Sequence, residues 1–190
     1  GVYLHDGSKP FNQWIDLQVG GGAAGSKYDV LDVTFSPNFA DDQQITALVT
    51  NDVAGSLTTK VTTMLVGSDW GTPINDATLG AFASSGGSLA FPVDYNSDPN
   101  SFRCIYYAGL NAGAYSAVYM IAGQEKPDSP LAIPMFIPDA TKAVYQMAIV
   151  GEAFAATITA GLTSGSVIYC DPTGAYWQTA QTPPSVTATA

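Results

Sequence analysis

The sequence predicts an all-β protein built from repeated units, and three observations lead to this prediction. Short runs of apolar or alternating residues, rich in Val, Ile, Thr, Tyr and Phe, recur between clusters of Gly, Pro, Asn, Asp and Ser. This pattern is typical of strands separated by turns. No stretch shows the apolar spacing of an amphipathic helix. One segment also recurs after 56 residues with its aromatic positions retained, which indicates an internal repeat.

The expected strands follow one another every 10 to 15 residues or so, roughly the spacing of a meander of hairpins. They are Val2–His5, Phe11–Val19, Val30–Phe35, Ile45–Thr50, Lys60–Val66, Leu89–Val93, Phe102–Ala108, Ala117–Ile121, Ala132–Ile137, Val144–Val150, Phe154–Ala160 and Ser166–Cys170. Glycine-rich breaks separate some of them, including Gly-Gly-Gly at 20–22 and Ser-Ser-Gly-Gly at 84–87.

The repeat is seen when residues 31–42 are compared with residues 87–98. The first segment reads Leu-Asp-Val-Thr-Phe-Ser-Pro-Asn-Phe-Ala-Asp-Asp and the second Gly-Ser-Leu-Ala-Phe-Pro-Val-Asp-Tyr-Asn-Ser-Asp. The alignment matches Phe35 with Phe91, Phe39 with Tyr95, and Asp42 with Asp98. In both copies an apolar strand precedes the segment and another follows it, and a weaker third copy begins near residue 144.

A second element recurs at the two ends of the chain. A strand at residues 2–5 leads through Asp6 and Gly7 to Trp14, and a strand at 167–170 leads through Asp171 and Gly174 to Trp177. In each case the Trp is expected to open the next strand. A period of about 55 residues with four strands fits a β-propeller blade better than a sandwich.

These segments resemble degenerate Asp-box repeats, whose pattern is Ser-x-Asp-x-Gly-x-x-Trp, in β-propellers of bacterial and archaeal cell-surface proteins, including S-layer-like proteins. The match departs from the pattern near Trp177, because Asp171 stands one residue early and Pro172 takes its place. The resemblance implies that the Asp residues cap turns and the Trp residues pack between sheets. The residues expected in such turn and packing roles are Asp6, Trp14, Phe35, Phe39, Asp42, Phe91, Tyr95, Asp98, Asp171, Gly174 and Trp177; Phe35, Phe39, Phe91 and Tyr95 are expected to form the core between the sheets.

The predicted fold is therefore a set of four-stranded antiparallel blades in an incomplete ring of about three blades plus a half-blade. The expected units are the end of a preceding blade at 1–19, blades at 27–82, 86–140 and 143–180, and a Thr- and Pro-containing linker or tail at 181–190. Propellers usually close with four or more blades. Further blades of the same protein or other copies of it are therefore expected as partners.

Composition narrows the classes of function. The six basic residues are scattered and the net charge is −10, which excludes a nucleic-acid surface because phosphate binding needs clustered Lys and Arg. The longest apolar stretch, residues 147–162, is interrupted by Glu152, so no transmembrane segment is expected. A polar but weakly charged composition favours an extracellular or cell-surface protein.

Two side-chain sets are candidates for cross-linking or metal binding. Cys104 and Cys170 either form a disulfide or remain as two small buried side chains. Calcium is the most plausible ligand, and the acidic turns would supply its oxygen atoms. The candidate ligands are Asp41, Asp42, Asp94 and Asp98.

No pattern of catalytic residues is recognisable, so the chain is expected not to be an enzyme. Sialidases share Asp-box propellers, but their cluster of arginines has no counterpart because Arg103 is the only arginine. Glu125 and Glu152 do not form a recognisable hydrolase pair. His5, the only histidine, lacks the Gly-x-Ser-x-Gly context of a serine hydrolase.

Two functions remain open at this stage. The first is a structural protein of a cell surface, such as an S-layer or sheath component, that assembles through strand edges. The second is a propeller module that binds glycan or protein through exposed aromatic residues. The candidate aromatic residues are Tyr106, Tyr107, Tyr115 and Tyr119. A fragment of a secreted glycoside hydrolase is a remote third alternative.

Overall fold

The computed structural model describes fourteen strands and one helical turn. The residues described are 1–7, 13–19, 28–51, 54, 57–71, 77–80, 84–91, 95, 104–111, 117–122, 131–135, 143–150, 153–159, 165–170 and 177–179, with the backbone alone at residues 6, 77, 80, 84 and 85 and from 104 onward. The elements are β1 (Tyr3–Asp6), β2 (Gln13–Asp16), β3 (Asp29–Phe35), α1 (Phe39–Asp42), β4 (Gln44–Asn51), β5 (Thr58–Leu65), β6 (Ala77–Gly80), β7 (Ser84–Ala90), β8 (Cys104–Asn111), β9 (Ala117–Ala122), β10 (Leu131–Met135), β11 (Ala143–Val150), β12 (Ala153–Thr159), β13 (Gly165–Cys170) and β14 (Trp177–Thr179). No helix in these described ranges is both long and apolar enough to cross a membrane.

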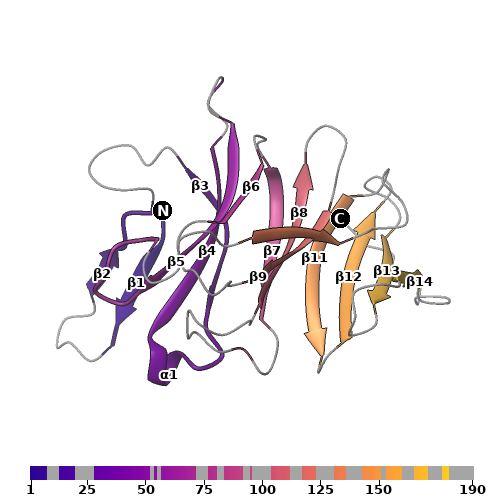
Figure 1. The fold of residues 1–190 in the computed structure, drawn as a ribbon. Helices are drawn as coiled ribbons and strands as arrows, with labels where there is room; N and C mark the ends of the chain where they lie inside the picture. The colour runs from indigo at the N-terminus through magenta and orange to yellow at the C-terminus, as the bar shows by residue number, and fades with distance from the viewer. Residues whose placement is uncertain are drawn as a thin grey trace, which may run out of the picture.

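The described strands form three four-stranded sheets and one hairpin, which confirms the all-β prediction. Strands β3–β6, β7–β10 and β11–β14 each pair in chain order, and every pairing is antiparallel. Strands β1 and β2 form a separate two-stranded sheet. Each sheet therefore uses one continuous stretch of chain (Figure 1).

The three four-stranded sheets begin at Asp29, Ser84 and Ala143 and end at Gly80, Met135 and Thr179. The second sheet starts at Ser84 instead of residue 86, and residues 84–87 form the first half of β7 instead of a break. Gly86 pairs with Leu110 and Gly87 pairs with Gly109 on β8. Backbone hydrogen bonds do not depend on the side chain. Pairing with β8 can therefore keep this Ser-Gly segment extended, although Ser and Gly have little strand preference of their own.

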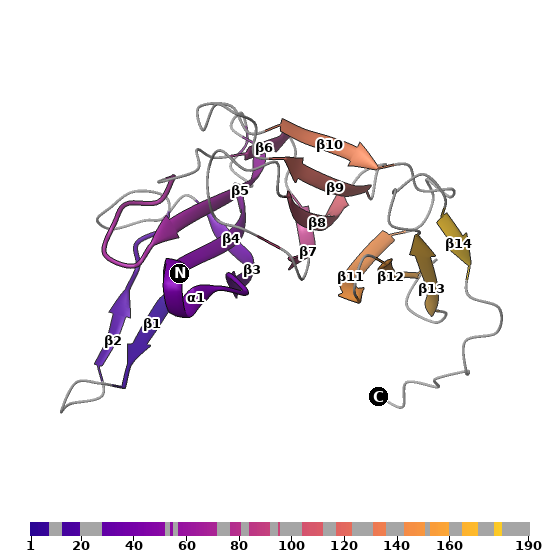
Figure 2. The same ribbon diagram turned by 60° about the horizontal axis from the view of Figure 1, so that its bottom comes forward.

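Contacts between sheets run mainly through the first strand of each. Strand β7 contacts β3 and β4 of the preceding sheet, and β11 contacts β7 and β8. Figure 2 shows the three sheets following one another along an arc, with the hairpin β1–β2 projecting beside the first of them. The same kind of junction thus joins two successive pairs of sheets.

The first sheet is buried on both faces. On one face Leu48 and Val61 pack with Leu89 and Tyr95 from the second sheet's segment. On the other face Ala47 and Val49 form a separate cluster whose other buried and partly buried members are Val2, Val19, Leu17, Tyr28, Val30 and Trp70. Because side chains alternate along a strand, β4 supplies both clusters, and all eight of its residues are buried. Full burial of a side chain such as Leu48 stabilises the fold by about 2–3 kcal/mol.

Threonine carries much of the polarity inside this sheet. Thr46, Thr50, Thr59, Thr62 and Thr63 are all buried. The hydroxyls of Thr50 and Thr59 lie 3.1 Å apart on neighbouring strands, so they share a hydrogen bond that offsets part of the cost of burying them. Threonine suits such positions because its branched side chain packs on a pleated sheet.

Candidate interaction surface and the sheet junctions beside it

Asp32 joins the first sheet to the second. One carboxylate oxygen, Oδ2, accepts a 2.7 Å hydrogen bond from the backbone N–H of Leu89 on β7. The other, Oδ1, accepts a 2.8 Å bond from the N–H of Val33. Strands β3 and β7 are both edge strands of their sheets. The Asp32 carboxylate on β3 therefore acts as the hydrogen-bond acceptor for the Leu89 N–H on β7, in place of a neighbouring strand. Nothing in the sequence distinguishes this residue from the other acidic residues near turns.

Tyr95 closes the same junction from the other side. It is 2% exposed, and its hydroxyl oxygen accepts a 2.6 Å hydrogen bond from Gln44 Nε2. The Asn38 side-chain amide donates to the backbone oxygen of Tyr95 at 2.9 Å. Burial raises the pKa of Tyr95 to about 12; the Gln44 hydrogen bond lowers it in part and the negative charge of Asp42 raises it further. Tyr95 thus fixes the second repeat to the first by both its ring and its backbone.

The two matched aromatic pairs have nearly the same geometry. The ring centroids of Phe35 and Phe39 are 4.5 Å apart at 57°, and those of Phe91 and Tyr95 are 4.5 Å apart at 62°. Their burial differs: Phe39 and Phe91 are half-buried, whereas Phe35 is 53% exposed. The expectation that Phe35 belongs to the core between sheets is therefore wrong. Phe35 ends the edge strand β3 and its ring contacts that of Phe39, which leaves about half of the side chain exposed.

Asp42 lies in the turn that α1 forms between β3 and β4. Its Oδ2 accepts from the Ser36 hydroxyl at 2.5 Å and its Oδ1 accepts from the Gln44 N–H at 2.9 Å. Both oxygens therefore stabilise the turn itself. Asp41 is exposed on the same helical turn. The fully described part of the chain contains no group of three acidic, His or Cys side chains placed to hold a metal. Asp94 and Asp98 lie outside the described residues, so calcium at these turns stays a prediction.

Trp70 fixes the hairpin to the first sheet. Its indole N–H donates a 2.7 Å hydrogen bond to the backbone oxygen of Leu17, just after β2. The turn before it is closed by two backbone bonds, from Ser68 N–H to Leu65 O at 2.9 Å and from Gly71 N–H to Thr63 O at 2.8 Å. Trp70 therefore has the packing role between neighbouring sheets that the sequence assigned to Trp14.

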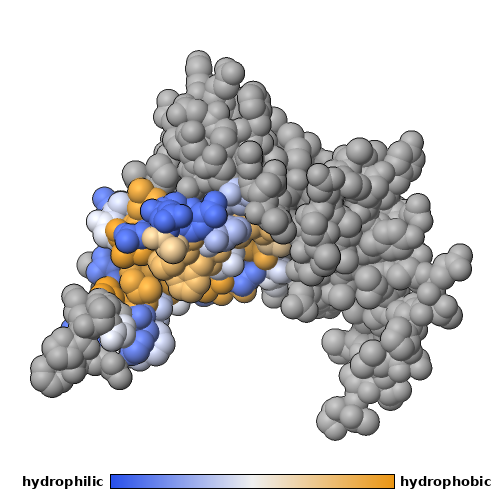
Figure 3. All heavy atoms as spheres, turned by 90° about the horizontal axis from the view of Figure 1, so that it is seen from below, coloured by the Kyte–Doolittle hydropathy of each residue, from blue (hydrophilic) through white to orange (hydrophobic). Residues whose placement is uncertain are grey.

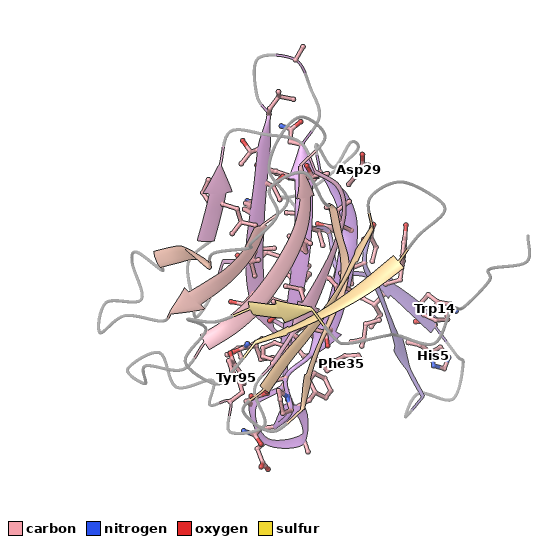
Figure 4. The ribbon with its side chains drawn as sticks, turned by 90° about the vertical axis from the view of Figure 1, so that its right-hand side faces the viewer. His5, Trp14, Asp29, Phe35 and Tyr95 are labelled. Atoms are coloured by element: carbon pink, nitrogen blue, oxygen red, sulfur yellow. The ribbon has the colours of Figure 1, made fainter. Side chains whose placement is uncertain are left out.

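Trp14 itself lies on the outside of the molecule, at 69% exposed, so the expectation that it packs between sheets is wrong. Along β1 and β2 the side chains alternate, and Trp14 shares the outer face with its cross-strand partner His5 and with Tyr3. The ring centroids of His5 and Trp14 are 5.0 Å apart at 49°, and Figure 4 shows the two rings side by side on the hairpin. None of the described sheets covers this face, because the hairpin packs on the first sheet with its opposite side, where Val2 and Leu17 lie. We call Tyr3, His5 and Trp14 the outer aromatic face.

A groove of about 760 Å³ lies between the hairpin and the end of β5. Its apolar lining comes from Leu4 and Ile15 on the hairpin and from the segment 64–70 opposite, and Asp16 and Asp69 add two carboxylates. Figure 3 shows apolar surface gathered on this fully described part of the chain, beside polar residues. Together, the outer aromatic face and the groove form the exposed apolar surface of the hairpin.

The remaining sequence candidates are placed by backbone alone or not at all. Asp6 ends β1 and Trp177 begins β14; Cys104 begins β8 and Cys170 ends β13. Tyr106 and Tyr107 lie in β8 and Tyr119 in β9. The side chains of all these residues lie outside the described part, as do Tyr115, Asp171 and Gly174 entirely. A disulfide between Cys104 and Cys170 therefore stays a prediction.

Comparison with known proteins gives a similarity of fold. No protein-family model matches the sequence, and no curated protein matches it. A solved structure does match, from a structural and mechanistic analysis of two prolyl endopeptidases and the role of inter-domain dynamics in their catalysis and specificity. The TM-score is 0.57 at 13% identity, over 93% of this chain and 25% of that chain. The likeness therefore concerns the fold alone, and this chain spans about a quarter of the length of the protein it matches.

Proposed function

We propose that this chain is a non-catalytic structural module of an extracellular or cell-surface protein, built from β-propeller-type blades that assemble with further blades or further copies. The observation that carries the proposal is the two-stranded hairpin beside three complete four-stranded sheets. A hairpin on its own is marginally stable in water. Its exposed Tyr3 and Trp14 therefore favour a surface that another sheet or strand completes.

The blade interpretation is supported by how the sheets are joined. Propeller blades are four-stranded meanders placed around an axis. A blade within such an array packs both of its faces against neighbours. The first sheet has two buried faces, and the first strands β3, β7 and β11 contact one another in succession. The fold likeness over 93% of the chain is in line with this arrangement, and the peptidase activity named in that work belongs to that protein.

The non-catalytic part of the proposal is supported by what the described carboxylates contact. Asp16 accepts from the Gln18 N–H at 3.0 Å, Asp32 from two backbone N–H groups, and Asp42 from a hydroxyl and a backbone N–H. These contacts hold turns and a sheet junction, which are structural tasks. With charged residues at only 12% of the chain, the composition also favours a surface component over a charged active-site cleft.

The proposal is tested by the location and assembly of the protein. Protease treatment of intact source cells should degrade it, and negative-stain imaging of the purified protein should show ordered polymers or closed rings instead of single particles. A cytoplasmic control protein should survive the same treatment. A protein that is protected inside the cell, or that stays a dispersed monomer at every concentration tested, would contradict the proposal.

A second candidate function is a module that binds glycan or protein. The outer aromatic face and the groove favour it, because exposed aromatic rings with nearby carboxylates can stack on sugars and hydrogen-bond to their hydroxyls. A glycan array separates the two functions. Binding that is lost in Trp14→Ala and kept in Phe35→Ala, another exposed aromatic residue on a different strand, would favour this second function.

A further inference from the structure

The groove beside the hairpin has the size and the lining of a site for a small ligand. Its volume of about 760 Å³ lies within the range of about 300–1,000 Å³ that is usual for such sites. Apolar side chains of both walls line it, namely Leu4, Ile15, Leu17, Met64, Val66 and Trp70. A site of this kind holds an apolar body and orients it with a few polar groups.

Hydrogen bonds hold both walls of the groove in place. The hairpin wall is formed mainly by residues 15–18, which lie on β2 or directly after it, so this wall depends little on what lies beside β1. The indole N–H of Trp70 donates to Leu17 O at 2.7 Å and joins the two walls. In the opposite wall the Ser68 hydroxyl accepts from the Leu65 N–H at 3.1 Å and donates to the Leu65 oxygen at 2.9 Å. The groove is therefore formed before any ligand arrives.

The polar side chains of the groove offer a ligand mainly hydrogen-bond acceptors. The Trp70 N–H and the Ser68 hydroxyl already donate within the protein. Asp16 uses one carboxylate oxygen to accept from the Gln18 N–H at 3.0 Å. Its second oxygen and the Asp69 carboxylate have no partner in the part of the chain that the structure describes. Among the described residues that line the groove none is basic, so these two carboxylates set its charge.

We propose that the groove binds a small organic amine, whose apolar ring or branched chain carries an ammonium group. The walls hold the apolar body, and the ammonium group donates to the carboxylates of Asp16 and Asp69. Each of these residues directly precedes one partner of the Trp70–Leu17 hydrogen bond, which brings their two segments together. An ammonium group gains charge-assisted hydrogen bonds there, whereas an anion is repelled by two carboxylates in a chain of net charge −10. Such binding does not depend on assembly, so it is tested apart from the proposed function.

Three probes of nearly the same shape test the class of ligand. Phenylbutylamine carries an ammonium group, phenylbutanol is neutral and phenylbutyrate is an anion. In NMR titrations the amine should bind most tightly, the alcohol about twofold to fivefold more weakly, as expected for the loss of one exposed ion pair, and the anion most weakly. Added salt should reduce the difference between the amine and the alcohol. Equal affinities for the three probes, or no binding of the amine, would overturn the proposal.

The indole N–H signal of Trp70 reports where the amine binds. Trp70 lines the groove, whereas Trp14 lies on the outer aromatic face. Loss of one signal in Trp70→Phe assigns the Trp70 resonance. Phenylbutylamine should shift this resonance and leave that of Trp14 unchanged. Binding that leaves the Trp70 signal in place, whichever other signal moves, contradicts the proposed site.

A pair of double variants tests the two carboxylates. Asp16→Asn combined with Asp69→Asn removes both charges, and the side-chain oxygen at position 16 can still accept from the Gln18 N–H. The preference for phenylbutylamine over phenylbutanol should disappear, while the affinity for phenylbutanol stays the same. Asp29→Asn combined with Asp41→Asn is the control, because it changes the net charge equally at exposed positions outside the groove. An equal loss of preference in the two double variants would count against the proposal.

A single substitution decides the matter if the double variant does not fold. Val66 lines the groove and is 36% exposed, so Val66→Lys places a fixed cation there and should remove binding of phenylbutylamine. Leu57→Lys is the matched control, because Leu57 is 41% exposed and lies outside the groove; it should bind the amine like the parent protein. Amine binding that persists in Val66→Lys would reject the site.

Discussion

The hydroxyl of Tyr95 accepts a 2.6 Å hydrogen bond from the side-chain amide of Gln44, which lies 51 residues earlier in the chain. The contact crosses from the second repeat to the first. Tyr95 is the counterpart of Phe39, which has no hydroxyl, so this bond is a property of one repeat junction and not of the repeat unit. Gln44 is fully buried, and its Oε1 has no hydrogen-bond partner. The junction therefore already holds one unpaired polar atom.

Tyr95→Phe should lower the free energy of unfolding by about 1–3 kcal/mol, because the Gln44 amide loses its close partner while staying buried. The Thr46 hydroxyl, at 3.4 Å, is a poor substitute. Urea unfolding followed by circular dichroism measures the change. Tyr3→Phe is the control: Tyr3 is 57% exposed, and its change should stay within about 0.5 kcal/mol. Similar losses for both variants would argue against the Tyr95 contact.

Stability should fall between about pH 10 and pH 12. The pKa of Tyr95 is raised to about 12 in the folded protein from 10.0, mainly by burial. Between these values the unfolded chain has lost the phenol proton and the folded chain has kept it, so a rise in pH favours unfolding. Two pKa units correspond to at most about 2.7 kcal/mol.

Absorbance titration near 295 nm measures this behaviour. A late phase of tyrosine ionisation, near pH 12, should be present in the folded protein and should disappear in Tyr95→Phe. The fall in unfolding free energy between pH 10 and 12 should also be shallower in that variant. A titration curve that is identical in shape for the two proteins would contradict the burial of the phenol.

Asp32→Ala should loosen the junction between the first two sheets. It leaves the Leu89 N–H without its 2.7 Å acceptor, at an expected cost of about 1–3 kcal/mol. Hydrogen exchange should show reduced protection of the Leu89 amide. Asp29→Ala is the control on the same strand, since Asp29 is exposed. Unchanged protection at Leu89 would mean that the Asp32 carboxylate is not the acceptor.

Trp70→Phe should release the hairpin from the first sheet. The ring remains apolar, but Leu17 loses the 2.7 Å indole hydrogen bond to its backbone oxygen, a loss of about 1 kcal/mol. Limited proteolysis should then cleave more quickly between residues 1 and 19. Trp14→Phe changes an exposed ring on the same hairpin and should leave the cleavage rate unchanged. Faster cleavage in the Trp14 variant alone would reverse the roles assigned to the two tryptophans.

The 56-residue repeat predicted local geometry well. Phe35 and Phe39 stand in the same relation as Phe91 and Tyr95, and both ring pairs have centroids 4.5 Å apart. Four residues separate the members of each pair across the end of a strand and the turn that follows. Local spacing of this kind is set by the chain itself, so it can be read from sequence.

Burial could not be read in the same way. Phe35 and Trp14 were expected in the core and are exposed, because burial depends on whether another sheet covers that face. Trp70, in the turn that follows β5, has the packing role instead. Strand β6 (Ala77–Gly80) and the first half of β7 were also missed, since pairing with β5 and β8 holds segments of weak strand preference.

The sequence by itself determined the all-β class, the strand–turn rhythm and the repeated aromatic pairs, because these follow from residue type and spacing over short stretches. Only the tertiary structure decided that Asp32 and Tyr95 join the sheets and that Trp70 anchors the hairpin. Each of these depends on contacts between residues about fifty positions apart in the chain. A hydrogen bond across a sheet junction is set by how the sheets pack, and that packing is a property of the whole folded chain.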